Sequence, residues 1–123
     1  MYVTDGDCVT MDRVQKFDSN GNFIKKFGSN GTGDGQFHCA AAVSVDSNGN
    51  IFVADPGNFR VQEFNSNGTF IAKYGIMGSA DGQLFSAYGL TVDSNDNLYV
   101  SDGCLMETCN NRIQKFSKTT AGQ

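Results

Sequence analysis

The stretch "NGNIFVADPGNFRVQEFNSNGTF", residues 48–70, decides the fold that we predict for this chain. It holds two apolar runs, and the second, "RVQEF", alternates polar and apolar residues with the period of two that a half-buried β-strand requires. An Asn-Gly pair stands near each end, and Asn-Gly between apolar runs is a strong hairpin signal because both residues tolerate positive φ. The stretch therefore predicts antiparallel strands joined by tight turns.

The same pattern occurs three times along the chain. Each time, a strand that ends in Asp is followed by a strand that begins with Arg and ends with Phe, and the unit recurs about every 50 residues. Residues 33–50 and 80–97, which precede the later two copies, align over eighteen positions without a gap. The paired strands are "YVTD" (2–5) with "RVQKF" (13–17), "FVAD" (52–55) with "RVQEF" (60–64), and "YVSD" (99–102) with "RIQKF" (112–116).

A complete unit contains four predicted strands. In the second copy these are "AAVSVD", "NIFVAD", "RVQEF" and "TFIAKYG", and the small apolar residues of the first favour a crowded strand buried on both faces. Fifteen Gly residues, a single Pro and no Trp agree with an all-β protein of short strands and many turns. We predict three units: residues 1–28, without the innermost strand; residues 29–75, complete; and residues 76–123, without the outermost strand.

Four-stranded antiparallel units that repeat at this period are typical of β-propeller blades. Residues 48–70 and 78–102 resemble the NHL-repeat family, whose blades carry a hydrophobic-Val-Ala-Asp strand end, an Asn-Arg-hydrophobic-Gln strand start and a Gly-Asp-Gly-Gln-Phe segment. The resemblance covers nearly the whole chain, although Ala40 and Ala87 stand where the family has Pro. It implies NHL-type blades, here about two and a half of them. Because repeats need capping or closure, we expect an open, partial propeller, either a fragment or one member of an assembled ring.

Charge and hydropathy argue against two classes of partner. Thirteen acidic and nine basic residues give a net charge of -4, and no basic cluster is larger than the pair Lys25 and Lys26. We therefore predict no nucleic acid binding, which depends on neutralising phosphates. No stretch reaches the roughly 18 apolar residues of a membrane helix, so we predict no membrane insertion. Residues 1–10 lack the basic start and apolar core of a signal peptide.

Asp and Arg recur at corresponding positions of all three copies. An Arg side chain that faces a carboxylate across a hairpin can form a charge-assisted pair. A catalytic role would need one unique pair, whereas these three are equivalent, so we interpret them as structural ion pairs. The predicted pairs are Asp5 with Arg13, Asp55 with Arg60, and Asp102 with Arg112.

The segment between this Asp and this Arg varies in length. It has seven residues in the first copy, four in the second and nine in the third. In a propeller these loops emerge on the same face as the segments before the innermost strands, and insertions in repeat proteins tend to mark the binding face. For Phe59 and Tyr88, packing between blades is an equal alternative to ligand contact. The predicted contact residues on this face are His38, Phe59, Tyr88, Leu105, Met106 and Glu107.

The four cysteines are expected on the same face. Four cysteines in a composition of this kind are typical of exported proteins with disulfides. Cys104 and Cys109 are close enough in sequence to close the longest loop, and Cys8 could reach Cys39 between neighbouring blades. We therefore predict the disulfides Cys104–Cys109 and Cys8–Cys39. The alternative, a zinc site with His38, lacks a Cys-x-x-Cys pair, so we predict no metal and no cofactor.

These features favour a non-catalytic propeller scaffold that recognises a protein, peptide or glycan. The alternative is a segment of a larger propeller enzyme, a lyase or hydrolase, because some NHL-like propellers are lyases that hold zinc through several histidines. This chain has one His, whereas a catalytic zinc normally needs three protein ligands. We expect self-association through exposed blade edges. The predicted disulfides and the exported members of the family indicate an extracellular or cell-surface location.

Overall fold

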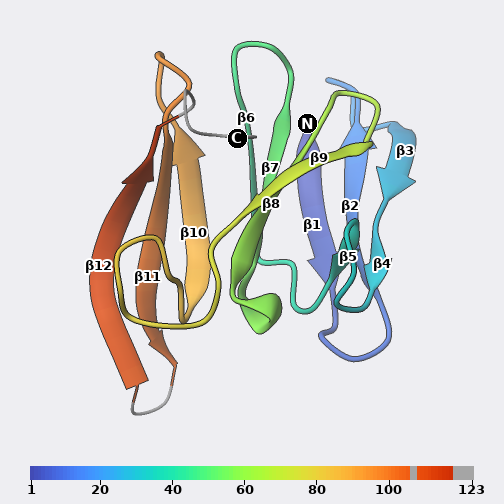
Figure 1. The fold of residues 1–123 in the computed structure, drawn as a ribbon. Helices are drawn as coiled ribbons and strands as arrows, with labels where there is room; N and C mark the ends of the chain where they lie inside the picture. Colours follow the sequence, from blue (N-terminus) through green and yellow to red (C-terminus); the bar gives the residue numbers. More distant parts are fainter. Residues whose placement is uncertain (106–107, 118–123) are drawn as a thin grey trace.

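The computed structural model describes residues 1–105 and 108–117 of the 123-residue chain; within 104–109 it describes only the backbone of the strand residues. In this described part, three antiparallel sheets follow one another, and one short 3-10 turn lies between strands of the second sheet (Figure 1). This arrangement confirms the predicted all-β class. The sheets of the described part form an open array and do not close into a ring.

Each sheet is a meander in which consecutive strands pair antiparallel. The first sheet contains β1 (Tyr2–Gly6), β2 (Asp12–Phe17) and β3 (Phe23–Phe27). The second contains β6 (Ala42–Val45), β7 (Ile51–Asp55), β8 (Arg60–Phe64) and β9 (Phe70–Tyr74), with the 3-10 turn η1 (Pro56–Asn58) after β7. The third contains β10 (Ala87–Val92), β11 (Leu98–Leu105) and β12 (Thr108–Phe116). A short parallel pair, β4 (Ser29–Asn30) with β5 (Gln36–Phe37), lies in the connection between the first two sheets.

The Asp-Ser-Asn segments form the tight turns that the sequence predicts. Asp18 Oδ1 accepts hydrogen bonds of 2.9 Å from the backbone N–H groups of Asn20 and Asn22. Gly21 takes a φ of 83°, which a residue without a Cβ adopts at little cost. Asp46 and Asp93 accept the equivalent bonds in the other two turns of this sequence. The turn side chains thus fix the register of each following hairpin.

Two apolar clusters lie between the sheets. Side chains alternate across β7, so Ile51 and Val53 enter one cluster and Phe52 enters the other. Every residue of β7 and β8 is buried, because the second sheet is covered by the first sheet on one side and by the third sheet on the other. The first cluster contains Val14, Phe37, Ile51, Val53 and Phe64, and the second contains Phe52, Val61, Leu84, Ala87, Leu98 and Val100.

The first strands of the second and third sheets differ from the prediction. They were expected to be buried on both faces, but β6 is half-buried, Val45 at its end is 40% exposed, and Tyr88 in β10 is 47% exposed. The prediction was wrong because β6 and β10 are edge strands. An edge strand pairs on one side only, so its side chains meet fewer neighbours.

The nine-residue segment between Asp102 and Arg112 is less of a loop than predicted. Backbone pairing continues past a register shift through Cys104 opposite Cys109 and Leu105 opposite Thr108. Residues 103–105 belong to β11 and residues 108–111 to β12, so the described part of this segment lengthens the hairpin.

Candidate functional site

The connections of variable length lie together at one end of the sheets. The β1–β2 loop, η1 and the segment that leads into β6 all lie at the lower end in Figure 1, and β11 and β12 meet at the same end. We call residues 7–11, 38–41 and 56–59 the loop face. Its position agrees with the propeller geometry expected for these connections.

Hydrogen bonds to one carboxylate fix the β1–β2 loop. Asp7 Oδ1 accepts from the backbone N–H groups of Val9, Thr10 and Met11 at 2.9, 2.7 and 2.8 Å, and Asp7 Oδ2 accepts from the Thr10 hydroxyl at 2.6 Å. The Thr10 hydroxyl and these backbone donors hold the pKa of Asp7 well below its usual range. Asp7 is therefore charged at neutral pH and holds the loop in one conformation.

Covalent and polar links join this loop to the second sheet. Cys8 in this loop and Cys39 in the segment that leads into β6 form a disulfide. The buried Asp12 side chain accepts 2.9 Å hydrogen bonds from the Asn30 amide and from the Ala40 backbone N–H. Two independent links thus set the position of the first sheet against the second. The expected Cys104–Cys109 disulfide involves side chains outside the described part of the chain and stays a prediction.

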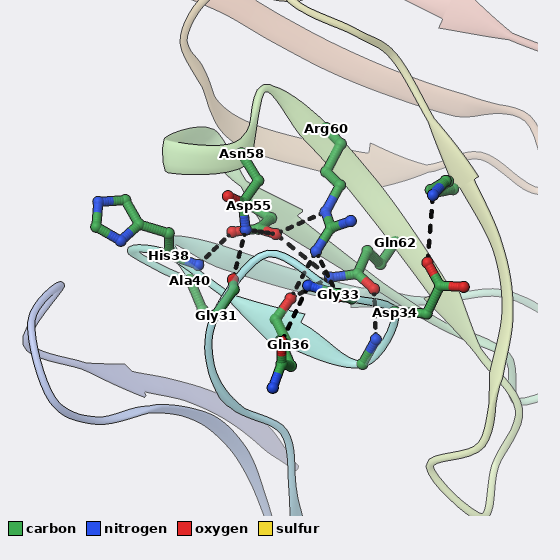
Figure 2. A network of polar contacts seen from close by, with 12 residues as sticks. Gly31, Gly33, Asp34, Gln36, His38, Ala40, Asp55, Asn58, Arg60 and Gln62 are labelled. Atoms are coloured by element: carbon green, nitrogen blue, oxygen red, sulfur yellow. Dashed lines mark hydrogen bonds and ion pairs between the residues drawn. The ribbon is translucent and has the colours of Figure 1, made fainter.

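The predicted contact residues do not share one environment. His38 is exposed, and its ring points away from the neighbouring polar network in Figure 2. Phe59 is half-buried in a left-handed conformation and packs against Phe85, with ring centroids 5.8 Å apart, so it contributes to packing between sheets. Tyr88 is exposed at the second position of β10. Leu105, Met106 and Glu107 lie outside the described side chains.

Exposed apolar residues that the sequence interpretation missed stand on the loop face. Val9 is 73% exposed and Met11 is 39% exposed. Both project from the loop that Asp7 and the Cys8–Cys39 link hold in place. Their signal in the sequence was weak, because an apolar residue in a loop looks the same whether it packs inward or faces solvent.

In the second sheet, Asp55 is the centre of a buried polar network (Figure 2). Its Oδ2 accepts hydrogen bonds from Arg60 Nε at 2.9 Å, Asn58 Nδ2 at 2.9 Å and Gln62 Nε2 at 3.3 Å. Its Oδ1 accepts a 2.7 Å bond from the backbone N–H of His38. Arg60 and Asp55 lie opposite one another in the strand register, which explains why the two residue types recur together.

The same network holds the glycine-rich connection that precedes β6. Arg60 donates to the carbonyl oxygens of Gly33 and Gln36, both at 2.8 Å. Gln62 makes two hydrogen bonds with the connection. Its Nε2 donates to the carbonyl oxygen of Gln36 at 2.6 Å, and its Oε1 accepts from the Gly35 backbone N–H at 2.9 Å. These are contacts to backbone groups, so they recognise the path of the connection and not its side chains.

The third sheet repeats this arrangement with one difference. Arg112 donates to the carbonyl oxygens of Ser79, Ala80 and Gln83 at 2.7 to 2.8 Å, while Gln114 Nε2 donates to Gln83 O at 2.7 Å. Gly82 N–H donates to Gln114 Oε1 at 2.8 Å. Arg112 Nε, however, lies 3.6 Å from Asp102 Oδ2, which is too long for a hydrogen bond. The Asn110 amide donates to that oxygen at 2.6 Å, as the Asn58 amide donates to Asp55 in the second sheet.

Opposing effects act on the Asp102 carboxyl. Burial raises its pKa, but the Asn110 amide, the backbone N–H groups of Ser86 and Phe85, and the Arg112 charge together outweigh burial. The net result is a lowered pKa, so Asp102 is ionised at neutral pH.

In the first sheet the corresponding side chains are partly exposed. Arg13 Nε and one terminal nitrogen lie 3.0 Å from Asp5 Oδ2, and Gln15 Nε2 donates to the same oxygen at 2.8 Å. Asp5 and Arg13 are 33% and 27% exposed at their side chains, compared with 0% and 7% for Asp55 and Arg60. All three predicted Asp-Arg pairs are thus adjacent, in three different environments.

Within the described residues, no group of three or more His, Cys, Asp or Glu side chains could hold a metal ion. Among these residues there is also no helix with the length and hydropathy of a membrane span.

Comparison with known proteins agrees with the repeated geometry. The model of the NHL repeat family matches residues 37–64 and 88–116. Over 60 residues, 49% of this chain, the sequence is 37% identical to NHL repeat-containing protein 3 of Homo sapiens and to NHL repeat-containing protein 3 of Mus musculus. The matched segment spans 17% of the length of these relatives.

Proposed function

This chain carries NHL repeats that form β-propeller blades, and we propose that it is a non-catalytic scaffold whose loop face binds a protein or peptide partner. In a propeller whose structural contacts repeat from blade to blade, specificity for a binding partner comes from the positions at which the repeats differ. Here those positions are the connections between the strand-ending Asp and the following Arg, which differ in length in every copy.

The observation that carries the proposal is the ordered β1–β2 loop. Asp7 binds three backbone N–H groups in it, and the Cys8–Cys39 link ties it to the segment before β6. A loop that is already fixed loses little conformational entropy when it binds a partner. Less of the free energy gained by burying its exposed apolar side chains is therefore offset by ordering the loop. Val9 and Met11 are such side chains.

The chemistry of these side chains favours a protein or peptide over a glycan. Val9 and Met11 offer apolar surface, and the adjacent His38 offers one ring that can donate or accept a hydrogen bond. A partner that fits would present an apolar side chain to the loop. The Cys8–Cys39 link also supports our proposal of an extracellular or cell-surface location, because disulfides persist in oxidising compartments.

A peptide library tests this proposal. Random peptides displayed on phage are selected on the wild-type chain, and the affinities of the selected peptides are then measured by calorimetry on two variants. Val9→Asp should weaken binding at least about tenfold, because it places a charge where apolar contact is needed. Ile71→Asp is the matched control, since Ile71 is 44% exposed on β9 and lies outside the loop face.

Equal loss of affinity in both variants, or unchanged affinity in Val9→Asp, would contradict the assignment to the loop face. Thermal melting of both variants accompanies the affinities, because exposed positions contribute few buried contacts and both proteins should stay folded.

A further inference from the structure

The triplet Asn-Gly-Thr occurs at two places in the chain, residues 30–32 and residues 67–69. An Asn followed two residues later by Ser or Thr, with any residue except Pro between them, is the acceptor pattern for N-linked glycans. The pattern alone is weak evidence, because turns rich in Asn, Gly and Thr produce it by chance. The two triplets lie in different environments, however, and only one of them is suited to carry a glycan.

The second triplet forms the turn between β8 and β9, and its Asn67 and Thr69 are both exposed. Asn65 Oδ1 accepts hydrogen bonds from the backbone N–H groups of these two residues, at 2.9 and 3.0 Å. The turn is thus held by the side chain of Asn65. Among the described residues, the Asn67 carboxamide and the Thr69 hydroxyl have no hydrogen-bond partner. The fold therefore presents this triplet on the surface with its acceptor nitrogen free.

The first triplet is built into the connection between the first and second sheets. Asn30 is half-buried and pairs with Phe37 in the short parallel ladder of β4 and β5. Its Nδ2 donates to Oδ2 of the buried Asp12 at 2.9 Å. The next residue, Gly31, donates to the Phe37 carbonyl oxygen and accepts from the Asn58 amide, both at 2.9 Å. A saccharide on Asn30 would stand against a buried carboxylate and would disrupt contacts that join the sheets.

The place of the β8–β9 turn in the fold also suits a large substituent. The turn lies at the upper end of the sheets in Figure 1, opposite the loop face. Lys25 Nζ donates to the Ser66 carbonyl oxygen at 2.6 Å, which holds the turn next to β3. β9 is an edge strand of the second sheet, with one side unpaired. A glycan on this turn would extend into solvent, leave the loop face open and help to shield the free edge of β9 from other strands.

We propose that Asn67 is an N-glycosylation site and that Asn30 is not. An oligosaccharyltransferase joins Asn67 Nδ2 to the anomeric carbon of an oligosaccharide that is linked to a lipid diphosphate. As this C–N bond forms, the bond from the anomeric carbon to the diphosphate oxygen breaks. The lipid diphosphate leaves with the electron pair, and Nδ2 gives up one proton. The inference rests on the extracellular or cell-surface location proposed above, because the acceptor pattern is used in secreted chains.

Secretion from cultured mammalian cells tests the proposal. The full chain is expressed behind a cleavable signal peptide and is collected from the medium. Peptide N-glycosidase F in heavy-oxygen water then converts each glycosylated Asn to Asp with an isotope label, and peptide mass spectrometry locates the label. We expect the label at position 67 and an unmodified Asn30. If little chain reaches the medium, the same digestion is applied to chain extracted from the microsomes, with the same expectation.

Two matched variants locate the acceptor. Thr69→Ala removes the hydroxyl of the second triplet and keeps Asn67, so the glycan and its mobility shift on gels should be lost. Thr32→Ala makes the same change in the first triplet, at an exposed position, and leaves the contact between Asn30 and Asp12 in place. This control should keep the full mobility shift. Thr69→Ser should restore the glycan, because Ser also satisfies the pattern.

Three results would overturn the proposal: an unmodified Asn67 in the wild-type chain, a glycan on Asn30 of the secreted chain, and equal loss of glycan in Thr69→Ala and Thr32→Ala. The added signal peptide directs the chain to export whatever its natural location, so these results do not depend on that location. Peptide binding to the loop face is measured on the chain without a glycan. The two proposals therefore fail separately.

Discussion

Replacing Arg60 with Ala tests whether the repeated Asp-Arg pair stabilises the fold, and Arg13→Ala is a matched control. The two pairs occupy the same strand register, with Asp55 opposite Arg60 and Asp5 opposite Arg13. The second-sheet pair is buried, whereas the first-sheet pair is about one-third exposed. The two substitutions therefore remove the same interaction from two different environments.

The two substitutions should lower the free energy of unfolding by different amounts. Water can solvate the Asp5 carboxylate after Arg13 is removed, but it cannot reach the buried Asp55 carboxylate after Arg60 is removed. Removing one partner of a buried ion pair costs about 3–5 kcal/mol, since it leaves the other charge buried. Asp55 keeps hydrogen bonds from His38, Asn58 and Gln62, so we expect the lower end, about 3 kcal/mol. Exposed pairs contribute about 0.2–1 kcal/mol, which sets the expected loss for Arg13→Ala.

Urea denaturation followed by far-UV circular dichroism measures both free energies. Should Arg60→Ala not fold, Arg60→Lys supplies the comparison, because it keeps the charge and loses the planar fork that binds Asp55 and the two carbonyl oxygens. Equal losses in the buried and exposed variants, or a loss below about 1 kcal/mol at Arg60, would refute the structural role of the buried pair.

Other substitutions and conditions isolate single contacts. Gly28 and Gly21 have φ values of 97° and 83°, but a Cβ would overlap a buried phenyl ring only at Gly28, so Gly28→Ala should lose about 1–3 kcal/mol more than Gly21→Ala in urea titrations. Cys8→Ser should lose about 3–4 kcal/mol, because the link to Cys39 closes a loop with a sequence separation of 31, and non-reducing peptide mass spectrometry should recover the linked pair. The pKa of Asp102 is lower in the folded state, so its contribution is present above the unfolded pKa of about 3.9 and is lost as pH falls through the folded value. Urea titrations between about pH 2 and pH 7 should show this acid loss in the wild type and a shallower one in Asp102→Asn.

Local sequence patterns predicted the sheets because hairpins depend on near neighbours. Asn-Gly pairs and strands with period-two alternation can each be recognised from a few neighbouring residues. In a hairpin with a tight turn, the Asp that ends one strand lies opposite the Arg that begins the next. The placement of Asp55 opposite Arg60 follows from this rule. The sequence did not predict the extended β11–β12 hairpin. The inserted residues do not alternate between polar and apolar, and a segment without that alternation is interpreted as a loop.

Contacts between sheets could not be predicted in the same way. Arg60 binds Gly33 and Gln36, which precede it by 27 and 24 residues, and no local pattern joins positions so far apart. A signal was nevertheless present, because the Gln residues of the strand and of the connection recur along with Asp and Arg. Asp12 carried no such signal: it occurs in one copy only, and its role depends on the backbone N–H of Ala40 in the segment that leads into β6.

The same pair of side chains lies in different environments in the first and second sheets. In the second sheet Arg60 is 7% exposed at its side chain, and its donors are used by Asp55 and by two carbonyl oxygens of the chain itself. In the first sheet Arg13 has the same partner across the strand and remains open to solvent. The chemistry of the two guanidinium groups is identical, so the difference lies in whether a connection has been placed over them. Because each connection is held through its backbone, Arg60 and Gln62 recognise the path of the chain, and that path depends on the positive φ that Gly35 adopts.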